Sequence, residues 1–269
     1  MQRIDPEIQK AKKTIRPFFV DKLNRPLKRP YYVTQLQTLL EKNHFPWIVY
    51  QAAIELIDKK HLSRIEIKTN YHERVVFFFN AKLDIPDYRP RLEKRVQLIG
   101  RLIDRYSKPT VTMALGKHLE GLVKAELRAQ GFKIVGIHTA EYRDKKWTKT
   151  DHDLDFIAEH KSGKLNIGVE VKNTLPIIER EELDIKLEMC QYLEIRPVFA
   201  VRWIKPYTEL IRGTQGFSWV FKTQVYPLGF EQLTKTLWEK LRLPVTVRTE
   251  LPERSVRLFE NWVRRNTKN

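Results

Sequence analysis

Three charged residues lie in a segment whose pattern is typical of two adjacent strands. Asp155 begins one short apolar run, and Glu170 and Lys172 end a second. A polar stretch, 159–164, separates the two runs and predicts a turn. Alternate residues of a strand point to opposite faces, so Glu170 and Lys172 share a face. If the runs pair as a hairpin, two carboxylates and one ammonium group meet at one edge of a sheet.

This set of side chains suits the metal-assisted hydrolysis of a phosphodiester. Carboxylate oxygens are the ligands that Mg²⁺ prefers, and a lysine beside them can orient or deprotonate a metal-bound water. Asp155 and Glu170 are the expected metal ligands, with the Val171 main-chain carbonyl as a third. The expected cofactor is Mg²⁺, with Mn²⁺ as a substitute. Asp153 shares a strand face with Asp155, and the choice between them stays open.

The spacing from Asp155 to Glu170-Val171-Lys172 resembles the catalytic core of the PD-(D/E)XK nuclease superfamily, which includes many restriction endonucleases and Holliday-junction resolvases. Leu154 stands where the superfamily's name has proline. The resemblance implies an α/β fold with a restriction-endonuclease-like mixed sheet flanked by helices. Its core runs helix, three strands, helix, strand, and the chain has a candidate for each. These are a helix at 114–130, strands at 132–140, 154–158 and 165–172, a helix at 179–194 and a strand at 197–204.

Two further roles follow from the same resemblance. Glu120, on the first of these helices, is expected to reach the metal directly or through water. The alternative is a surface ion pair with Lys124, four residues on. For Glu170 and Lys172 the alternative is an ion pair on a solvated face. Lys186 and Gln191 lie on the second helix, where members of the superfamily often carry a basic or amide residue near the phosphate. Solvated surface positions are the favoured expectation for both.

The charge of the chain favours a nucleic-acid partner. The formal net charge is +17, a field that attracts polyanions and supports non-specific DNA binding. The flanks carry most of it: 22 Lys and Arg against 12 Asp and Glu in 1–105, and 12 against 6 in 205–269. Residues 106–204 carry 16 against 15, so the predicted catalytic core is nearly neutral.

The first part of the chain resembles a winged helix-turn-helix module. Helices are predicted at 34–43 and 44–62, and two strands at 63–80 around a polar turn. In such modules the second helix enters the major groove and the ribbon contacts the backbone or minor groove. Other modules of this kind dimerise or bind protein, and that alternative stays open. The residues expected to contact DNA are Gln51, Lys59, Lys60, Lys68, Asn70 and Arg74.

These patterns predict four segments: a basic winged-helix-like α+β domain at 1–90, a linker helix at 91–106, a nuclease core at 107–204 and a basic extension at 205–269. The extension ends in a predicted amphipathic helix at 252–266. It could cover the sheet, form a dimer contact or lie along phosphates, and the sequence leaves these open.

Several classes of protein are excluded. Cys190 is the only cysteine, so an intramolecular disulfide and a cysteine zinc cluster are excluded, and a small core residue is expected there. There is no phosphate-binding loop of the GxxxxGK[ST] type and no apolar run long enough to cross a membrane. A cytoplasmic, nucleoid-associated protein with no membrane partner is expected.

The leading hypothesis is a Mg²⁺-dependent DNA endonuclease of restriction, repair or recombination, with Glu120, Asp155, Glu170 and Lys172 as its catalytic residues. The alternatives are a non-catalytic DNA-binding or assembly protein with a vestigial nuclease fold, and the end-cleaving subunit of a transposase. A homodimer, and a partner protein that activates or targets cleavage, are both left open.

Overall fold

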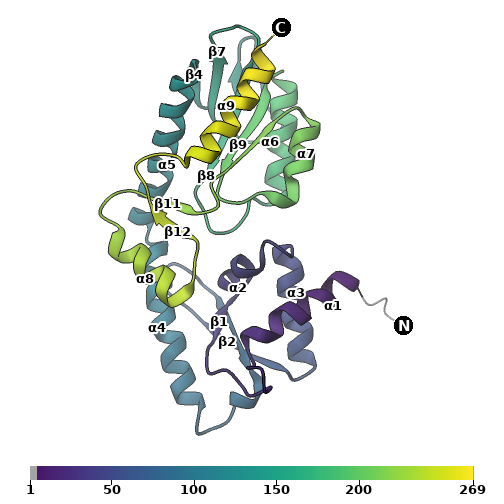
Figure 1. Ribbon diagram of the computed structural model, residues 1–269, viewed down its shortest axis with the longest axis vertical. Helices are drawn as coiled ribbons and strands as arrows, with labels where there is room; N and C mark the ends of the chain where they lie inside the picture. Colours follow the sequence, from purple (N-terminus) through teal and green to yellow (C-terminus); the bar gives the residue numbers. More distant parts are fainter. Residues whose placement is uncertain (1–4, 269) are drawn as a thin grey trace. The chain divides into compact units, whose positions relative to one another are not determined.

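The computed structural model describes residues 5–268 and divides into two compact units. The first unit is Met1–Thr112 with Lys235–Leu243, and the second is Met113–Thr234 with Pro244–Asn269. Residues 1–4 and 269, which belong to the predicted first and last segments, lie outside the described residues. Figure 1 shows the elements of each unit along the chain.

The first unit combines four helices with a small antiparallel sheet of strand order β1-β3-β2. The helix pair and the hairpin predicted between 34 and 80 are confirmed, whereas α1 and β1 were not predicted. The elements are α1 (Pro6–Ile15), a 3-10 turn (Arg16–Phe18), β1 (Tyr31–Tyr32), α2 (Val33–Leu40), α3 (Pro46–Asp58), β2 (Leu62–Ile67), β3 (Val75–Asn80), a second 3-10 turn (Ala81–Leu83) and α4 (Arg89–Ser107).

Local signals explain where α1 begins and where α3 ends. Asp5 caps α1, because its carboxylate accepts a hydrogen bond of 2.8 Å from the Glu7 main-chain N–H. The helix predicted at 44–62 ends at Asp58, because Lys60 takes a left-handed conformation with φ of 56°. Lys59 and Lys60, two of the residues expected to contact DNA, therefore follow the last residue of this helix and do not lie on its face.

The second unit contains the predicted catalytic segment. Its elements are α5 (Pro109–Ala129), β4 (Phe132–Thr139), β5 (Glu141–Tyr142), β6 (Lys145–Lys146), β7 (Leu154–His160), β8 (Asn166–Lys172), α6 (Arg180–Tyr192), β9 (Arg196–Val201), a 3-10 turn (Lys205–Tyr207), α7 (Thr208–Gly213), β10 (Phe217–Val220), β11 (Gln224–Tyr226), α8 (Glu231–Leu241), β12 (Val245–Val247) and α9 (Glu253–Thr267). The first residues of α5 and the last of α8 belong to the first unit.

A mixed five-stranded sheet of order β10-β9-β8-β7-β4 forms the centre of this unit. The predicted hairpin is confirmed, because β7 and β8 are antiparallel with Phe156 opposite Val169. β9 lies between β8 and β10 and is parallel to both, as its continuous apolar sequence predicted. Residues 216–227 do not form one continuous strand. The segment forms β10 and β11, separated by a left-handed residue, Lys222, with φ of 67°.

Helices cover both faces of this sheet. α5 and α9 share one hydrophobic cluster with the sheet, and α6 and α7 pack in a cluster on the other face. Phe259 of α9 stacks on Trp219 of β10 with ring centroids 4.1 Å apart, so covering the sheet is the role that the structure shows for the predicted last helix. Cys190 is buried among apolar residues, which confirms the expected core position.

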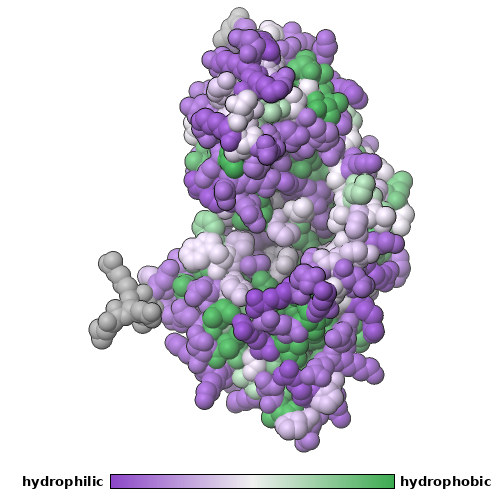
Figure 2. Space-filling model, turned by 180° about the vertical axis from the view of Figure 1, so that it is seen from behind, coloured by the Kyte–Doolittle hydropathy of each residue, from purple (hydrophilic) through white to green (hydrophobic). Residues whose placement is uncertain are grey.

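Among residues 5–268, no helix is both long enough and apolar enough to span a membrane. The face of the molecule in Figure 2 is mostly hydrophilic, with hydrophobic residues in separate patches.

Candidate active site

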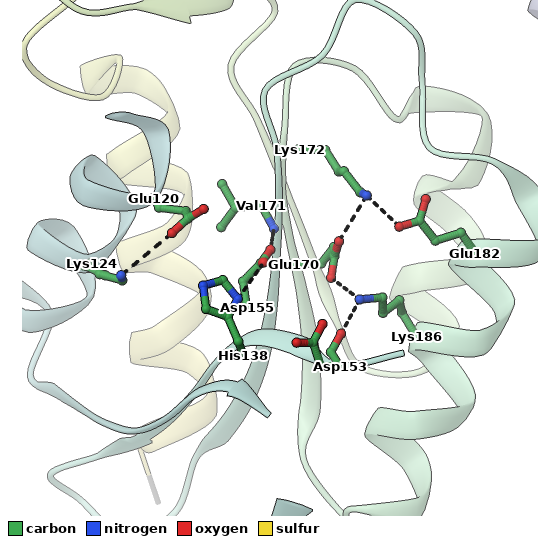
Figure 3. Close-up of polar contacts among 10 residues, drawn as sticks. All are labelled: Glu120, Lys124, His138, Asp153, Asp155, Glu170, Val171, Lys172, Glu182 and Lys186. Atoms are coloured by element: carbon green, nitrogen blue, oxygen red, sulfur yellow. Dashed lines mark hydrogen bonds and ion pairs between the residues drawn. The ribbon is translucent and has the colours of Figure 1, made fainter. Parts of the chain in front are cut away.

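Asp155, Glu170 and Lys172 lie at the end of the β7–β8 hairpin that is remote from its turn (Figure 3). Asp155 is the second residue of β7, and Glu170 and Lys172 are at the end of β8. The paired register of β7 and β8 ends at Phe156 and Val169, and Asp155 and Glu170 are the next residues beyond that pair. The structure therefore brings together the two carboxylates and the lysine of the predicted site.

The Asp155 carboxylate is fixed by the backbone of the neighbouring strand. Its Oδ2 accepts a hydrogen bond of 2.6 Å from the Val171 main-chain N–H, and its Oδ1 lies 3.7 Å from His138 Nδ1. Burial raises the pKa of Asp155 above its ordinary value, although the Val171 hydrogen bond opposes the change. The negative charge of Glu120 raises this pKa further.

Glu170 is the most perturbed acid of the site. The residue is only 4% exposed, and its Oε2 lies 2.6 Å from Lys186 Nζ. Burial, together with the negative charge of Asp155, raises the pKa of Glu170 to about 7, although Lys186 opposes the shift. The alternative of an ion pair on a solvated face is therefore wrong for Glu170, because this carboxylate is buried.

Lys172 is held between two carboxylates. Its Nζ lies 2.6 Å from Glu182 Oε1 and 3.5 Å from Glu170 Oε1. Burial alone lowers the pKa of Lys172, but the hydrogen bond to Glu182 and the charge of Glu170 outweigh it and raise the pKa above its ordinary value. Lys172 is therefore a protonated hydrogen-bond donor in this arrangement.

Lys186 is a site residue that the sequence analysis assigned to the solvated surface, and that prediction is wrong. Its side chain is 6% exposed, and besides pairing with Glu170 it donates to the Asp153 main-chain carbonyl. The signal that could have found it is its position on α6, within the apolar stripe of Leu183, Leu187 and Cys190. Gln191 is exposed, as predicted.

Glu120 forms the ion pair that was one of the two predictions for it. Its carboxylate lies 3.8 Å from Lys124, so the surface ion pair along α5 is present. Its charge also reaches Asp155, where it raises the pKa. Figure 3 shows the Glu120 side chain on the same side of Asp155 as His138, whereas Glu170 turns toward Lys186.

The donor atoms of the site fit a divalent cation in chemical type. Asp155 and Glu170 supply carboxylate oxygens from neighbouring strands, and burial is the main cause of the raised pKa of each, with the negative charge of Asp155 adding to the shift of Glu170. In the part of the chain that the structure describes, no three His, Cys, Asp or Glu side chains already converge as a metal site. The carboxylates of Glu170 and Glu120 are turned instead toward Lys186 and Lys124.

The residues predicted to contact DNA in the first unit are all exposed. They are Gln51 on α3, Lys59 and Lys60 just after it, and Lys68, Asn70 and Arg74 around the β2–β3 turn. The three turn residues each have a partner within the unit. These pairs are Lys68 with Glu73 at 2.8 Å, Arg74 with Glu66 at 2.6 Å, and Asn70 Nδ2 with Asp104 Oδ2 at 3.0 Å.

Comparisons of this chain with protein-family models, with curated proteins and with solved structures each return no match.

Proposed function

We propose that the protein is a metal-dependent endonuclease that hydrolyses phosphodiester bonds in DNA. The observation that carries the proposal is the buried Glu170 close to Asp155, with a protonated Lys172 beside it. Burying two carboxylates together costs stability unless a cation compensates them. A perturbed acid with a specific charged partner is typical of a functional site.

Each residue has a defined role in this proposal. The Asp155 and Glu170 carboxylates and the Val171 carbonyl would hold Mg²⁺ or Mn²⁺. The bound ion would neutralise the scissile phosphate and activate a water. Lys172 donates hydrogen bonds to that water and to the phosphate oxygen on which negative charge develops. Asp155 is favoured over Asp153, because the Val171 N–H already directs the Asp155 carboxylate toward the strand of Glu170.

The order of elements supports the same proposal. Helix α5, strands β4, β7 and β8, helix α6 and strand β9 follow the order of the PD-(D/E)XK core that the sequence resembles. In the first unit, the order α1-β1-α2-α3-β2-β3 supports a winged-helix-like module that contacts DNA through α3 and the β2–β3 turn. The net charge of +17 favours the same partner.

The test is the cleavage of linear duplex, single-stranded, flap and four-way-junction DNA with Mg²⁺, Mn²⁺ or EDTA. Lys172→Ala is expected to abolish metal-dependent cleavage and to retain DNA binding. Lys164→Ala, a variant of an exposed lysine in the β7–β8 turn, is the matched control and is expected to cleave normally. Unchanged cleavage by Lys172→Ala, or binding without cleavage under every metal, would count against the proposal.

A further inference from the structure

A groove of the second unit follows strand β10 at the edge of the sheet. It consists of two cavities of about 510 and 570 Å³ that share Phe217 and Ser218. The smaller cavity continues along β10 to Thr223 and is closed by the start of α9, and the larger one lies between α7 and the end of α9. Volumes of this size suit ligands about as large as a nucleotide.

The lining of this groove, which we call the β10 groove, is basic and contains no Asp or Glu. Its cationic side chains come from α7, from the end of β10, from the 248–254 segment and from α9. They are Arg212, Lys222, Arg248, Arg254 and Arg265. Part of the positive charge of 205–269 is thus gathered along one strand.

Among residues 5–268, only one of these five cations has a carboxylate partner. Arg212 pairs with Glu209 at 2.8 Å, and Arg265 donates to the Asn261 carbonyl. Lys222, Arg248 and Arg254 line the smaller cavity, and their side chains have no carboxylate partner among residues 5–268. Clustered cations without counterions attract an anionic ligand, because such a ligand removes their mutual repulsion.

Three residues that line the same cavity, Ser218, Trp219 and Thr223, have a buried side-chain polar atom without a partner among the described residues. Ser218 Oγ and Thr223 Oγ1 are both buried and make no hydrogen bond within the described part of the chain. A buried hydroxyl without a partner costs free energy, so such groups usually meet protein, water or ligand.

The smaller cavity reaches the carboxyl end of β10, and the candidate active site lies at the carboxyl end of β8. β8, β9 and β10 are parallel, and their register aligns Lys172 with Val201 and Val201 with Val220. Lys222 and Thr223 are the second and third residues after Val220. Two strand spacings, about 10 Å, separate β8 from β10. The smaller cavity therefore lies near the carboxyl end of the strand that carries Lys172, although Lys172 pairs with α6 on the face of the sheet opposite to α9.

We propose that the β10 groove binds the phosphate backbone of a single polynucleotide strand. The regular charge of such a strand matches a lining with five cations and no carboxylate. An acidic peptide that adds as a further strand beside β10 is disfavoured. β10 has only four residues, and only alternate ones point their main-chain N–H and C=O groups toward the free edge. The inference goes beyond the proposed function, since binding here requires neither metal nor hydrolysis.

The experiment measures the binding of a fluorescein-labelled single-stranded oligonucleotide by anisotropy in EDTA, as a function of salt. The triple variant Lys222→Ala/Arg248→Ala/Arg254→Ala is compared with Lys133→Ala/Lys161→Ala/Lys164→Ala, which removes three exposed lysines of the same unit outside the groove. The groove variant is expected to reduce the slope of log K against log[salt] by about 2, at about 0.7 per phosphate contact, and to weaken binding about 100-fold at about 0.1 M salt. The control is expected to bind like the wild type.

Equal losses in both triple variants would overturn the inference, because net charge would then explain binding. Loss of binding to a labelled oligoglutamate, with oligonucleotide binding unchanged, would also overturn it and identify a peptide site. Because EDTA prevents metal-dependent cleavage, these results are independent of whether the protein is a nuclease. Conversely, a failed cleavage assay with the expected salt slopes would refute the proposed function alone.

Discussion

Glu170 should make the stability of the second unit depend on pH in an unusual direction. The perturbation that isolates this effect is the double variant Glu170→Gln/Lys186→Met, which removes both members of the buried pair. Neither substitution then leaves an unpaired buried charge, and replacing a buried pair by neutral residues is often well tolerated. The comparison of interest is the difference in the free energy of unfolding between the double variant and the wild type.

The sign and size of the effect follow from the pKa of Glu170. Its ordinary value of 4.5 rises to about 7 in the folded protein. Below pH 4.5 the group is protonated in both states and has no effect. Between these values the unfolded chain has lost the proton that the folded chain keeps, so the wild type loses stability as pH rises. At 1.36 kcal/mol per pH unit, the interval corresponds to about 3 kcal/mol. Glu170 is almost fully buried, so solvent screening does not reduce this figure.

The assay is urea unfolding followed by tryptophan fluorescence, at pH values from about 5 to about 8. The free energy of unfolding of the double variant, relative to the wild type, is expected to increase by about 2 to 3 kcal/mol over this range, with most of the change below pH 7. The increase should level off above pH 7, where Glu170 is ionised in both states. A difference that stays constant from pH 5 to pH 8 would refute the reasoning, because Glu170 would then titrate like an exposed acid.

Three further predictions test the same site and its support. Lys186→Met alone should cost about 3 kcal/mol near pH 8, where the ionised Glu170 loses its partner at 2.6 Å, and less near pH 5, as urea unfolding will show. Mg²⁺ should raise the thermal midpoint near pH 8 but not near pH 5, since Asp155 and Glu170 must be deprotonated to bind it, and Glu170→Gln should abolish the rise in scanning fluorimetry. Gly168→Ala should cost about 1–3 kcal/mol, because its new methyl would lie 2.8–2.9 Å from three side chains. Gly121→Ala is the control in the same urea assay and should not destabilise, since nothing lies within 4 Å of the added methyl.

The hairpin and its charged residues could be predicted because the signals are local. The apolar runs before the polar turn and after it are close in sequence, and strand alternation places Glu170 and Lys172 on one face. The same reasoning predicted the ends of α5, α6 and β9 to within about five residues. The largest departure is the start of α5, which was predicted at 114 and lies at Pro109. Periodicity alone carries this information.

The features that were missed depend on residues far apart in the chain. Lys186 was assigned to the surface because a lysine is usually solvated. Its place in the apolar stripe of α6 is a local signal for burial, but its partner Glu170 on β8 is brought to it only by the packing of α6 on the sheet. The split between β10 and β11 depends on the left-handed conformation of Lys222, which cannot be predicted from a lysine at this position. The β10 groove combines 217–223 with 248–258, and no local pattern links these segments.

The spacing of charges on β8 and α6 explains how the candidate catalytic side chains are positioned. Glu170 pairs with Lys186 and Lys172 pairs with Glu182, so two strand residues meet two helix residues in reverse order. Two residues along a strand span about 7 Å, and four along a helix span about 6 Å, so both pairs form without distortion. The orientation of Glu170 and Lys172 is therefore set by α6 rather than by the hairpin alone. It follows that exchanging the charges of Glu182 and Lys186 would preserve the hairpin and still displace both side chains.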